Sequence, residues 1–280
     1  MRRATLALGR RTLVMGVLNV TPDSFSDGGK FLNVRRAVEH ALQMQRDGAD
    51  IIDIGAESTR PGSEEIPVAE ELARLVPVLE SLRGKLKIPI SVDTQKAAVA
   101  EIAIGAGAAM INDVSGLRHD PRLAEVVAHR GVPLVLMHMR GTPRTMQKLP
   151  FAKDVTKDVL SGLKKSVSIA RKTGVAKSRI IVDPGIGFGK SFEQNYELLG
   201  KLGEIAKLGY PLLVGTSRKG FLGNTLARNG EPAPAEKRIW ATAATVTASI
   251  LGGAHIVRVH DVAEMAQVAR VADCVLDNAV

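Results

Sequence analysis

The sequence predicts a single (β/α)8 barrel, or TIM barrel, with a short hairpin before its first strand. Eight short apolar segments typical of strands alternate with amphipathic segments typical of helices along all 280 residues. Hydrophobic residues make up 45% of the chain and aromatic residues only 3%, so aliphatic side chains must build the core, as in parallel strands buried on both faces. Barrels of this kind fill about 250 residues. Because no linker-like segment divides the chain, residues 1–280 are expected to form one domain.

Each predicted strand is a short run rich in aliphatic residues. The strands are expected at Thr12–Asn19, Asp50–Gly55, Ile88–Asp93, Met110–Asp113, Leu134–His138, Ile180–Asp183, Pro211–Gly215 and His255–Val259. Between them, apolar residues recur at helical spacing. The helices are expected at Val34–Arg46, Val68–Leu82, Gln95–Gly105, Leu123–Arg130, Val155–Thr173, Glu193–Leu208, Lys237–Gly252 and Val262–Val275. An open doubly wound sheet is the rival architecture, but eight units in one series favour a closed barrel.

Charge and cysteine content narrow the function classes. The net charge of +9 suggests an anionic partner. Nucleic acid is not expected, because no dense Lys/Arg stripe occurs and the chain has one Trp and two Tyr for base stacking. A small anionic substrate accounts for the dispersed basic residues better than a basic surface alone. The lone Cys274 excludes an internal disulfide and fits a reducing cytoplasm.

The N-terminus carries four arginines without an acidic residue among its first eleven residues. The apolar stretch between them is too short for a signal peptide, so a hairpin leading into the first strand is the favoured interpretation, with an organelle transit peptide as the alternative. No apolar run approaches the ~20 residues that span a membrane, so no membrane partner is expected.

The loop after the first predicted strand is the most informative segment. It follows Asn19 directly and carries Phe25 and Asp27 in a Pro/Ser/Gly-rich context. Ordinary strand-to-helix connections take about 2–6 residues, whereas helical periodicity here resumes only near Asn33. A long polar loop after a buried strand is where binding and catalysis tend to sit, although a surface insertion would look similar.

Nearly every predicted strand ends at polar or charged residues. They are Asn19, Asp53, Asp93, Asn112, Asp113, His138, Asp183, Ser217, Arg218, Lys219, Arg258 and His260. In such barrels the loops at the carboxyl ends of the strands form the active site. Single Asn and Asp residues there can be helix caps, but eight occurrences in register indicate a site.

The residue types divide this ring into two sets. Asp93, Asn112, Asp183 and Lys219 offer the acceptors and donors that suit a flat, nitrogen-rich heterocycle; a buried Asp–Lys pair serving stability is the alternative.

The second set suits phosphate or diphosphate. Arg60 and Arg258 can grip phosphate oxygens with their forked guanidinium groups, and His260 adds a donor. Asn19 supplies one oxygen ligand for Mg²⁺, with phosphates and water completing the octahedron. Solvated surface arginines are the alternative for Arg60 and Arg258.

No protein nucleophile stands out. No serine lies in a nucleophile elbow, and no His/Cys spacing indicates zinc. The chemistry must then come from positioning and electrostatics. The glycine-dense segment Asp183–Lys190 lacks dinucleotide spacing, and its glycines are expected to let the chain turn while Phe188 faces the mouth.

Eight motifs together strongly resemble the dihydropteroate synthases, a pterin-binding barrel family of the folate pathway. The motifs are Gly16–Gly29, Asp53–Gly62, Ser91–Thr94, Ile111–Gly116, Met137–Pro143, Asp183–Lys190, Ser217–Lys219 and Arg258–Asp261. They follow the family's order and cover essentially the whole chain.

The resemblance implies condensation of a dihydropterin hydroxymethyl diphosphate with p-aminobenzoate, releasing pyrophosphate, in an enzyme that sulfonamides target. It implies that Asp93, Asn112, Asp183 and Lys219 hold the pterin. It places the diphosphate and Mg²⁺ near Asn19, Arg60, Arg258 and His260. The family mechanism is dissociative, so that Asp27 would stabilise a pterin cation when its loop closes, with Arg60 and Lys219 as the other catalytic residues.

The resemblance also assigns the second substrate. Phe25, Thr59, Arg60, Pro61 and Phe188 would build the p-aminobenzoate slot. The family often has a serine after Ser-Arg-Lys that contacts the p-aminobenzoate carboxylate; here that position is Gly220, whose backbone N–H would serve instead. Family members are typically dimers that meet through their last helices, so a homodimer is expected.

Two other functions remain open from sequence. A methyltransferase domain that passes a methyl group from methyltetrahydrofolate to a corrinoid protein needs neither a diphosphate clamp nor a p-aminobenzoate slot. A catalytically silent barrel predicts degraded motifs. The Thr21–Asp27 loop and Arg60 count against the former, and the intact motifs count against the latter.

Overall fold

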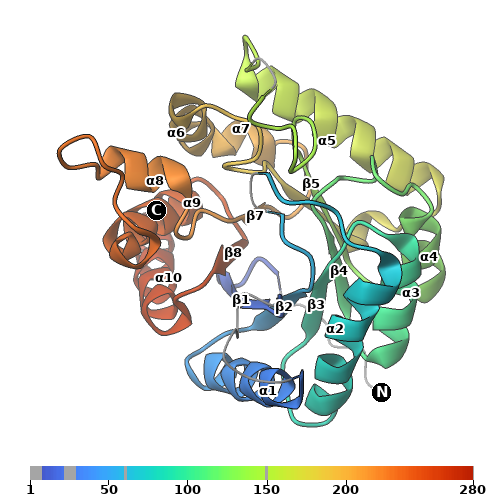
Figure 1. Ribbon diagram of the computed structural model, residues 1–280. Helices are drawn as coiled ribbons and strands as arrows, with labels where there is room; N and C mark the ends of the chain where they lie inside the picture. The colour runs from blue at the N-terminus through green and yellow to red at the C-terminus, as the bar shows by residue number, and fades with distance from the viewer. Residues whose placement is uncertain (1–7, 22–29, 60–61, 149–150, 280) are drawn as a thin grey trace.

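Eight parallel strands close into a barrel with helices around it (Figure 1). The computed structural model describes residues 8–21, 30–59, 62–148 and 151–279, with residues 30–33 described by their backbone alone. The strands are β1 (Leu13–Asn19), β2 (Ile51–Gly55), β3 (Ile90–Asp93), β4 (Met110–Asp113), β5 (Leu134–Met137), β6 (Ile180–Asp183), β7 (Leu213–Val214) and β8 (Ile256–Val259). They pair in the order β6-β5-β4-β3-β2-β1-β8-β7. A parallel bridge between Val182 and Leu212, with Val182 N donating to Pro211 O at 2.9 Å, closes the ring. The predicted barrel is confirmed.

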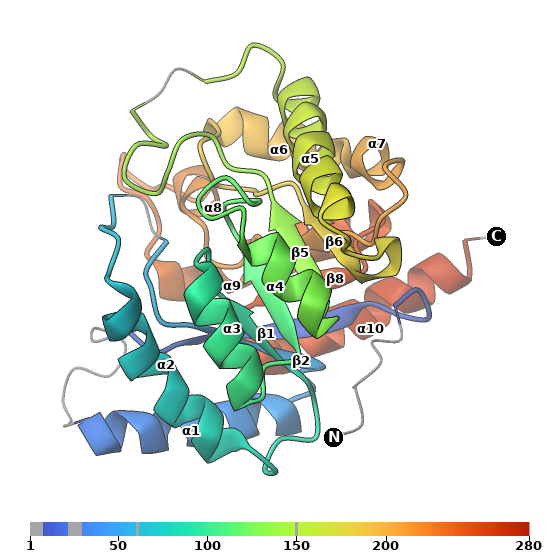
Figure 2. The same ribbon diagram turned by 90° about the vertical axis from the view of Figure 1, so that its right-hand side faces the viewer.

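The helices lie outside this ring (Figures 1 and 2). They are α1 (Lys30–Arg46), α2 (Val68–Leu82), α3 (Ala97–Ala106), α4 (Leu123–Arg130), α5 (Val155–Lys172), α6 (Phe192–Gly200), α7 (Leu202–Ala206), α8 (Gly220–Thr225), α9 (Ile239–Leu251) and α10 (Val262–Asp277). The predicted helix Glu193–Leu208 is interrupted at Lys201, whose backbone (φ −116°, ψ 18°) leaves the helical region directly after Gly200. No described helix is long and apolar enough to cross a membrane.

One further difference from the predicted elements concerns a short helix, and one predicted element, the hairpin before β1, stays a prediction. The six-residue α8 was not predicted, because it is shorter than the window in which helical periodicity can be recognised. The hairpin expected before β1 lies largely on residues 1–7, outside the described residues. Residues 8–11 form a turn and bends that lead directly into β1.

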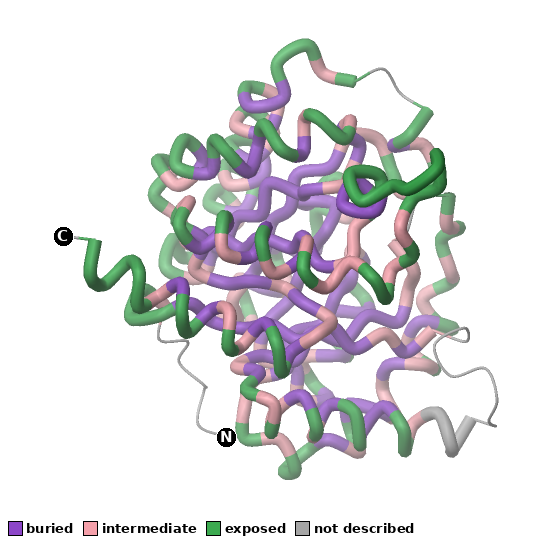
Figure 3. Tube along the Cα trace, turned by 90° about the vertical axis from the view of Figure 1, so that its left-hand side faces the viewer, coloured by how far each residue is buried: buried purple, intermediate pink, exposed green. Residues whose placement is uncertain are grey.

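The inside of the barrel is filled by one apolar layer toward the amino ends of the strands. It consists of Leu13, Met15, Ile51, Met110, Val135, Ile181, Leu213 and Ile256, with Leu8 packed against it. A larger aliphatic core lies between the strands and the helices. The tube in Figure 3 shows the same division, with buried strands inside and exposed outer faces on the helices.

The alternation of side chains along each strand determines which residues line the barrel above the apolar layer, toward the carboxyl ends of the strands. Successive side chains point to opposite faces, so the residue two positions after each interior residue also points inward. These positions hold Asp53 after Ile51, Asn112 after Met110, Asp183 after Ile181 and Arg258 after Ile256. The carboxyl end of the barrel is therefore lined by charged and polar groups.

Candidate active site

Arg258 lies at the centre of the polar layer. Its Nε donates to Asp53 Oδ2 at 2.7 Å and its Nη2 donates to Asp93 Oδ2 at 3.1 Å. Asn112 Nδ2 donates to the same Asp53 oxygen at 3.1 Å. β8, β2, β3 and β4 thus each contribute one member of a single network. The residue types predict Arg258 in an anion-binding set and Asp93 and Asn112 in a set for a heterocycle, whereas the structure joins all three in one network.

Asp53 is a site residue to which sequence reasoning gave no role. It is fully buried, and its Oδ1 has no hydrogen-bond partner among the described residues. A buried carboxylate oxygen without a donor is uncommon, and ligands often supply what is missing. The signal available in the sequence was its place in the ring of polar strand ends.

The carboxyl groups of this layer are poorly solvated. Burial raises the pKa of Asp93 well above its usual range, against the opposing charge of Arg258. Burial likewise raises the pKa of Asp183, against the opposing charge of Lys219. One arginine compensates Asp53 and Asp93 together, so the pocket favours ligands that donate hydrogen bonds to carboxylates.

Lys219 and Phe188 meet beside Arg258, because they follow β7 and β6, and β7 is the neighbour of β8 in the barrel. Lys219 Nζ lies 4.7 Å from the centroid of the Phe188 ring and donates to the carbonyl oxygen of Ile186. Burial lowers the pKa of Lys219 to about 8, with Asp183 opposing and Arg258 reinforcing the shift. Asp183 is fixed by Gly185 N, which donates to its Oδ1 at 2.7 Å. The predicted group of Asp93, Asn112, Asp183 and Lys219 does converge on one end of the barrel.

A methionine-rich wall completes this side of the site. Val114, Met137, Met139 and Met146 form a separate buried cluster, against which Phe188 packs. Met137 pairs with Asp183 across β5 and β6, so apolar surface lies directly beside the acceptor. Met side chains adapt to flat aromatic surfaces. Sequence reasoning missed this wall because apolar residues after strands look like ordinary core.

Asn19 and His260 stand at the rim. Asn19 is half-buried at the end of β1, and its Oδ1 faces Gly55 together with Asp93 Oδ2. His260 Nδ1 lies 3.0 Å from Ser217 Oγ. Burial, with the nearby charges of Arg258 and Arg218, lowers the pKa of His260 to about 4, so its imidazole is neutral at pH 7. Arg218 pairs with Asp261 by donating to both of its carboxylate oxygens.

Of the remaining predicted site residues, the structure describes two and leaves four outside the described residues. Thr59 is half-buried, and Gly220 is the first residue of α8. Phe25, Asp27, Arg60 and Pro61 lie outside the described residues. Among the residues that the structure describes, no group of three or more His, Cys, Asp or Glu side chains gathers as a metal site. Asn19 fits a metal held at one protein ligand, because its carboxamide oxygen lies at the end of β1, on the same side of Gly55 as Asp93 Oδ2.

Comparison with known proteins agrees with this geometry. The pterin binding enzyme family matches residues 15–260. A dihydropteroate synthase of Synechocystis sp. is 51% identical over 265 residues, covering 95% of this chain and 90% of that protein.

Two solved structures superpose closely. The dihydropteroate synthase of Yersinia pestis in a sulfonamide drug complex has a TM-score of 0.90 at 42% identity, covering 99% of this chain and 98% of that one. That of Xanthomonas albilineans with 4-aminobenzoic acid has a TM-score of 0.88 at 43% identity, covering 95% and 94%. With its barrel, its converging polar residues and these relatives, the chain belongs to the pterin-binding enzyme family and, within it, to the dihydropteroate synthases.

Proposed function

We propose that this transferase condenses (7,8-dihydropterin-6-yl)methyl diphosphate with p-aminobenzoate to give 7,8-dihydropteroate and pyrophosphate. The observation that carries the proposal is the convergence of Asp93, Asn112, Asp183 and Lys219 around Arg258, beside a methionine wall. Related structures hold 4-aminobenzoic acid and 7,8-dihydropteroate, which are the second substrate and the product of this reaction.

The pterin would lie flat against Met137 and Met139, with its edge toward the carboxylates. Asp93 and Asp183 would accept hydrogen bonds from its N–H groups, and Asn112 has both a donor and an acceptor to offer. Lys219 would donate to a ring nitrogen or to the ring carbonyl. Its pKa of about 8 keeps most of the ammonium protonated at pH 7.

The diphosphate would lie at the rim beside Asn19, Arg258 and His260, with Arg60 joining by its place in the sequence motif. Mg²⁺, bound through Asn19, would supply charge neutralisation for the departing pyrophosphate. Arg258 would add a fixed positive charge, and neutral His260 would donate one hydrogen bond. These groups favour the charge that develops on the leaving oxygen.

The reaction would proceed by loss of pyrophosphate before the amine attacks. The bond between the pterin methylene carbon and the diphosphate oxygen breaks, and its electron pair leaves with pyrophosphate. Asp27 would stabilise the resulting cation. The p-aminobenzoate nitrogen then forms the new C–N bond and gives up one proton. This route needs no protein nucleophile, and the single cysteine, Cys274, is exposed on α10.

The p-aminobenzoate slot would be built from Phe25, Thr59, Arg60, Pro61 and Phe188. Its carboxylate would meet the backbone N–H of Gly220. Sulfonamides would compete for this slot, as the Yersinia pestis complex with a sulfonamide drug suggests. We further propose that the chain is one domain and acts in the cytoplasm as a homodimer on small molecules, without a nucleic-acid or membrane partner.

A pyrophosphate-release assay tests the proposal. The pterin diphosphate and Mg²⁺ are supplied with and without p-aminobenzoate, and both pyrophosphate and the coupled pteroate are measured. Stoichiometric formation of both with p-aminobenzoate is the expected result. Asp183→Asn serves as the control for a damaged pterin site, because loss of one hydrogen bond involving a charged group costs about 1.5–3 kcal/mol of binding free energy. Pterin binding without coupled product would contradict the synthase assignment.

A further inference from the structure

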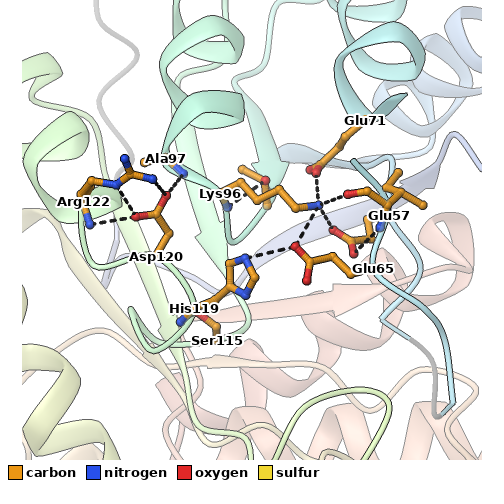
Figure 4. Close-up of polar contacts among 11 residues, drawn as sticks. Glu57, Glu65, Glu71, Lys96, Ala97, Ser115, His119, Asp120 and Arg122 are labelled. Carbon is orange, nitrogen blue, oxygen red and sulfur yellow. Dashed lines mark hydrogen bonds and ion pairs between the residues drawn. The ribbon is translucent and has the colours of Figure 1, made fainter. Parts of the chain in front are cut away.

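A buried ion cluster lies under the loop between β2 and α2 (Figure 4). Its centre is Lys96, in the turn between β3 and α3, whose side chain is only 6% exposed. Lys96 Nζ donates to Glu57 Oε2 at 2.7 Å, to Glu71 Oε2 at 2.8 Å and to Ile66 O at 2.8 Å. Three acceptors satisfy all three N–H groups of the ammonium. No step of the reaction described above uses these residues.

The cluster clasps both ends of one loop. Glu57 stands at the beginning of the segment that leaves β2, and Ile66 stands just before α2. Besides sharing Lys96, the two are joined directly, because Ile66 N donates to Glu57 Oε1 at 3.3 Å. The segment between them carries Thr59 and is held further by Gly62 N, which donates to Pro143 O at 2.9 Å. Ser63 Oγ also donates to Ser58 O at 2.6 Å within the loop. Lys96 is thus the side chain that joins both ends of the loop to β3 and α2, beside the bonds within the loop itself.

Lys96 also connects this loop to the pterin side of the site. It follows the last residue of β3, Asp93, by three positions, and its backbone N donates to Thr94 Oγ1 at 3.3 Å. Asp93 is bonded to Arg258 at the centre of the polar layer. A shift of Lys96 would thus move the Thr59 loop relative to Asp93.

The composition of the cluster argues against a role in stability alone. One ammonium faces two carboxylates that are almost fully buried, since the side chain of Glu57 is 8% exposed and that of Glu71 is 0% exposed. Glu71 Oε1 has no hydrogen-bond partner among the described residues. Burial raises the pKa of Glu57, with the nearby Glu71 adding to the shift and Lys96 opposing it. Well-packed apolar residues would stabilise such a position at least as well as a buried ion cluster does.

Glu65 and His119 close the outer side of the cluster. Glu65 Oε1 lies 3.9 Å from Lys96 Nζ and 3.3 Å from His119 Nε2. Glu65 is half exposed, at 54%, so its contribution is screened by water. Within the loop, Lys96 therefore holds Glu57 and Ile66 by close hydrogen bonds, whereas Glu65 contributes little.

We propose that Lys96 is a positioning residue for the second substrate: by clasping Glu57 and Ile66 it fixes the loop that carries Thr59 over the mouth. The inference rests on the proposed function, because Thr59 is assigned there to the p-aminobenzoate slot. It predicts a defect in the use of p-aminobenzoate without a defect in the binding of pterin.

The test compares Lys96→Met with Lys201→Met. Lys201 bonds Glu197 at 2.8 Å on an exposed surface, so its variant removes a lysine–glutamate pair away from the loop. For Lys96→Met the KM for p-aminobenzoate is expected to rise by about tenfold to a hundredfold, the effect of misplacing a binding group by about 1 Å. The dissociation constant of a phosphate-free pterin, measured by calorimetry, is expected to stay at the wild-type value. Lys201→Met should change neither quantity.

A second comparison separates positioning from folding. Glu57→Leu cuts the link to the loop, whereas Glu71→Leu cuts only the link to α2. The KM for p-aminobenzoate should rise in the first variant and stay near wild type in the second. If Lys96→Met does not fold, the double variant Lys96→Met/Glu71→Leu replaces it. The second change removes the buried Glu71 carboxylate, which the loss of Lys96 would leave unpaired. The KM of the double variant for p-aminobenzoate must still be raised.

Two outcomes would overturn the inference: a folded Lys96 variant with wild-type KM for p-aminobenzoate, or an equal loss of pterin affinity. A failure of the proposed function is recognised separately, since wild-type protein would then form no dihydropteroate at all.

Discussion

At the scale of single residues, Arg258 has two tasks that a substitution can separate. Two of its nitrogen atoms hold Asp53 and Asp93, and its charge faces the proposed diphosphate position. Removing the whole side chain would leave buried carboxylates unpaired, which typically costs about 3–5 kcal/mol of stability. Arg258→Lys keeps the charge and loses the forked geometry, so it is the sharper probe.

For Arg258→Lys we expect the pterin diphosphate to lose at least about tenfold in affinity, equivalent to about 1.4 kcal/mol. A phosphate-free pterin should lose less, because Nη1, which is not one of the two nitrogens that hold Asp53 and Asp93, has no counterpart in lysine and would be the donor to the phosphate oxygens. Calorimetric titration with both ligands measures the difference. Equal losses would mean that Arg258 serves the pterin pocket only.

His260 gives a pH-dependent prediction. Its pKa is about 4 in the folded protein and about 6.5 in an unfolded chain, so between these values the unfolded state binds more protons. Wild-type stability should therefore fall as the pH drops from about 6.5 to 4. In His260→Asn the free energy of unfolding should depend less steeply on pH over this range. Urea unfolding at several pH values measures this dependence. An identical slope in both proteins would show that His260 does not stay neutral.

Gly220 permits a gain-of-function prediction. A Cβ added there meets no atom within 4 Å, and no positive φ requires glycine at this position. Gly220→Ser would restore the hydroxyl that the family often has. We expect tighter p-aminobenzoate binding by about 1.5–3 kcal/mol, the value of a hydrogen bond to a charged group. The KM for p-aminobenzoate, with Gly220→Ala as control, measures the effect; equal KM values for both would place the carboxylate elsewhere.

At the scale of elements, the loop between β6 and α6 depends on a glycine. Gly185 has φ +66°, and a Cβ there would lie 1.9 Å from His138 O, a backbone atom that cannot simply rotate away. Gly185→Ala is expected to lower the free energy of unfolding by at least about 1–3 kcal/mol, as strained backbone positions do. Gly203→Ala in α7, where a Cβ meets nothing within 4 Å, should instead stabilise by about 0.5–1 kcal/mol. Urea unfolding distinguishes the two; a stable Gly185→Ala would show that this loop is pliable.

Strand and helix positions were largely predictable because each signal is local. Aliphatic runs located all eight strands, and α2 and α4 begin and end where periodicity predicted. Contacts between distant residues carry no local signal. Arg258 and Asp53 are 205 positions apart, and Glu71 looks like one charge on a solvated helix face, although it is fully buried beside Lys96. Residue type and barrel topology predicted which groups share the mouth, but not which of them bond to one another.

At the scale of the whole molecule, the ends of α9 and α10 carry exposed apolar side chains. Leu251, Val271, Val275 and Leu276 are 47%, 65%, 54% and 41% exposed. α9 leads to the amino end of β8 and α10 returns from the carboxyl end of β8, so both helices run toward the amino ends of the strands and their last turns lie toward the same end of the barrel. Figures 2 and 3 show the last turns of α10 projecting beyond the rest of the molecule. Adjacent exposed apolar residues of this kind are typical of an interface.

A dimer formed through this end predicts a specific response to charge. Val271→Lys should shift the protein from dimer to monomer in sedimentation velocity, because a stable interface of about 1,000 Å² or more excludes unpaired charge from its centre. Ile102→Lys, which changes an equally apolar and 45% exposed residue on α3, should leave the dimer intact. The site lies at the carboxyl ends of the strands, whereas Val271 lies in the second half of α10, so the monomer should still bind pterin. A wild-type protein that sediments as a monomer would remove the dimer proposal while leaving the active-site assignment untouched, since every described member of the polar network comes from this one chain.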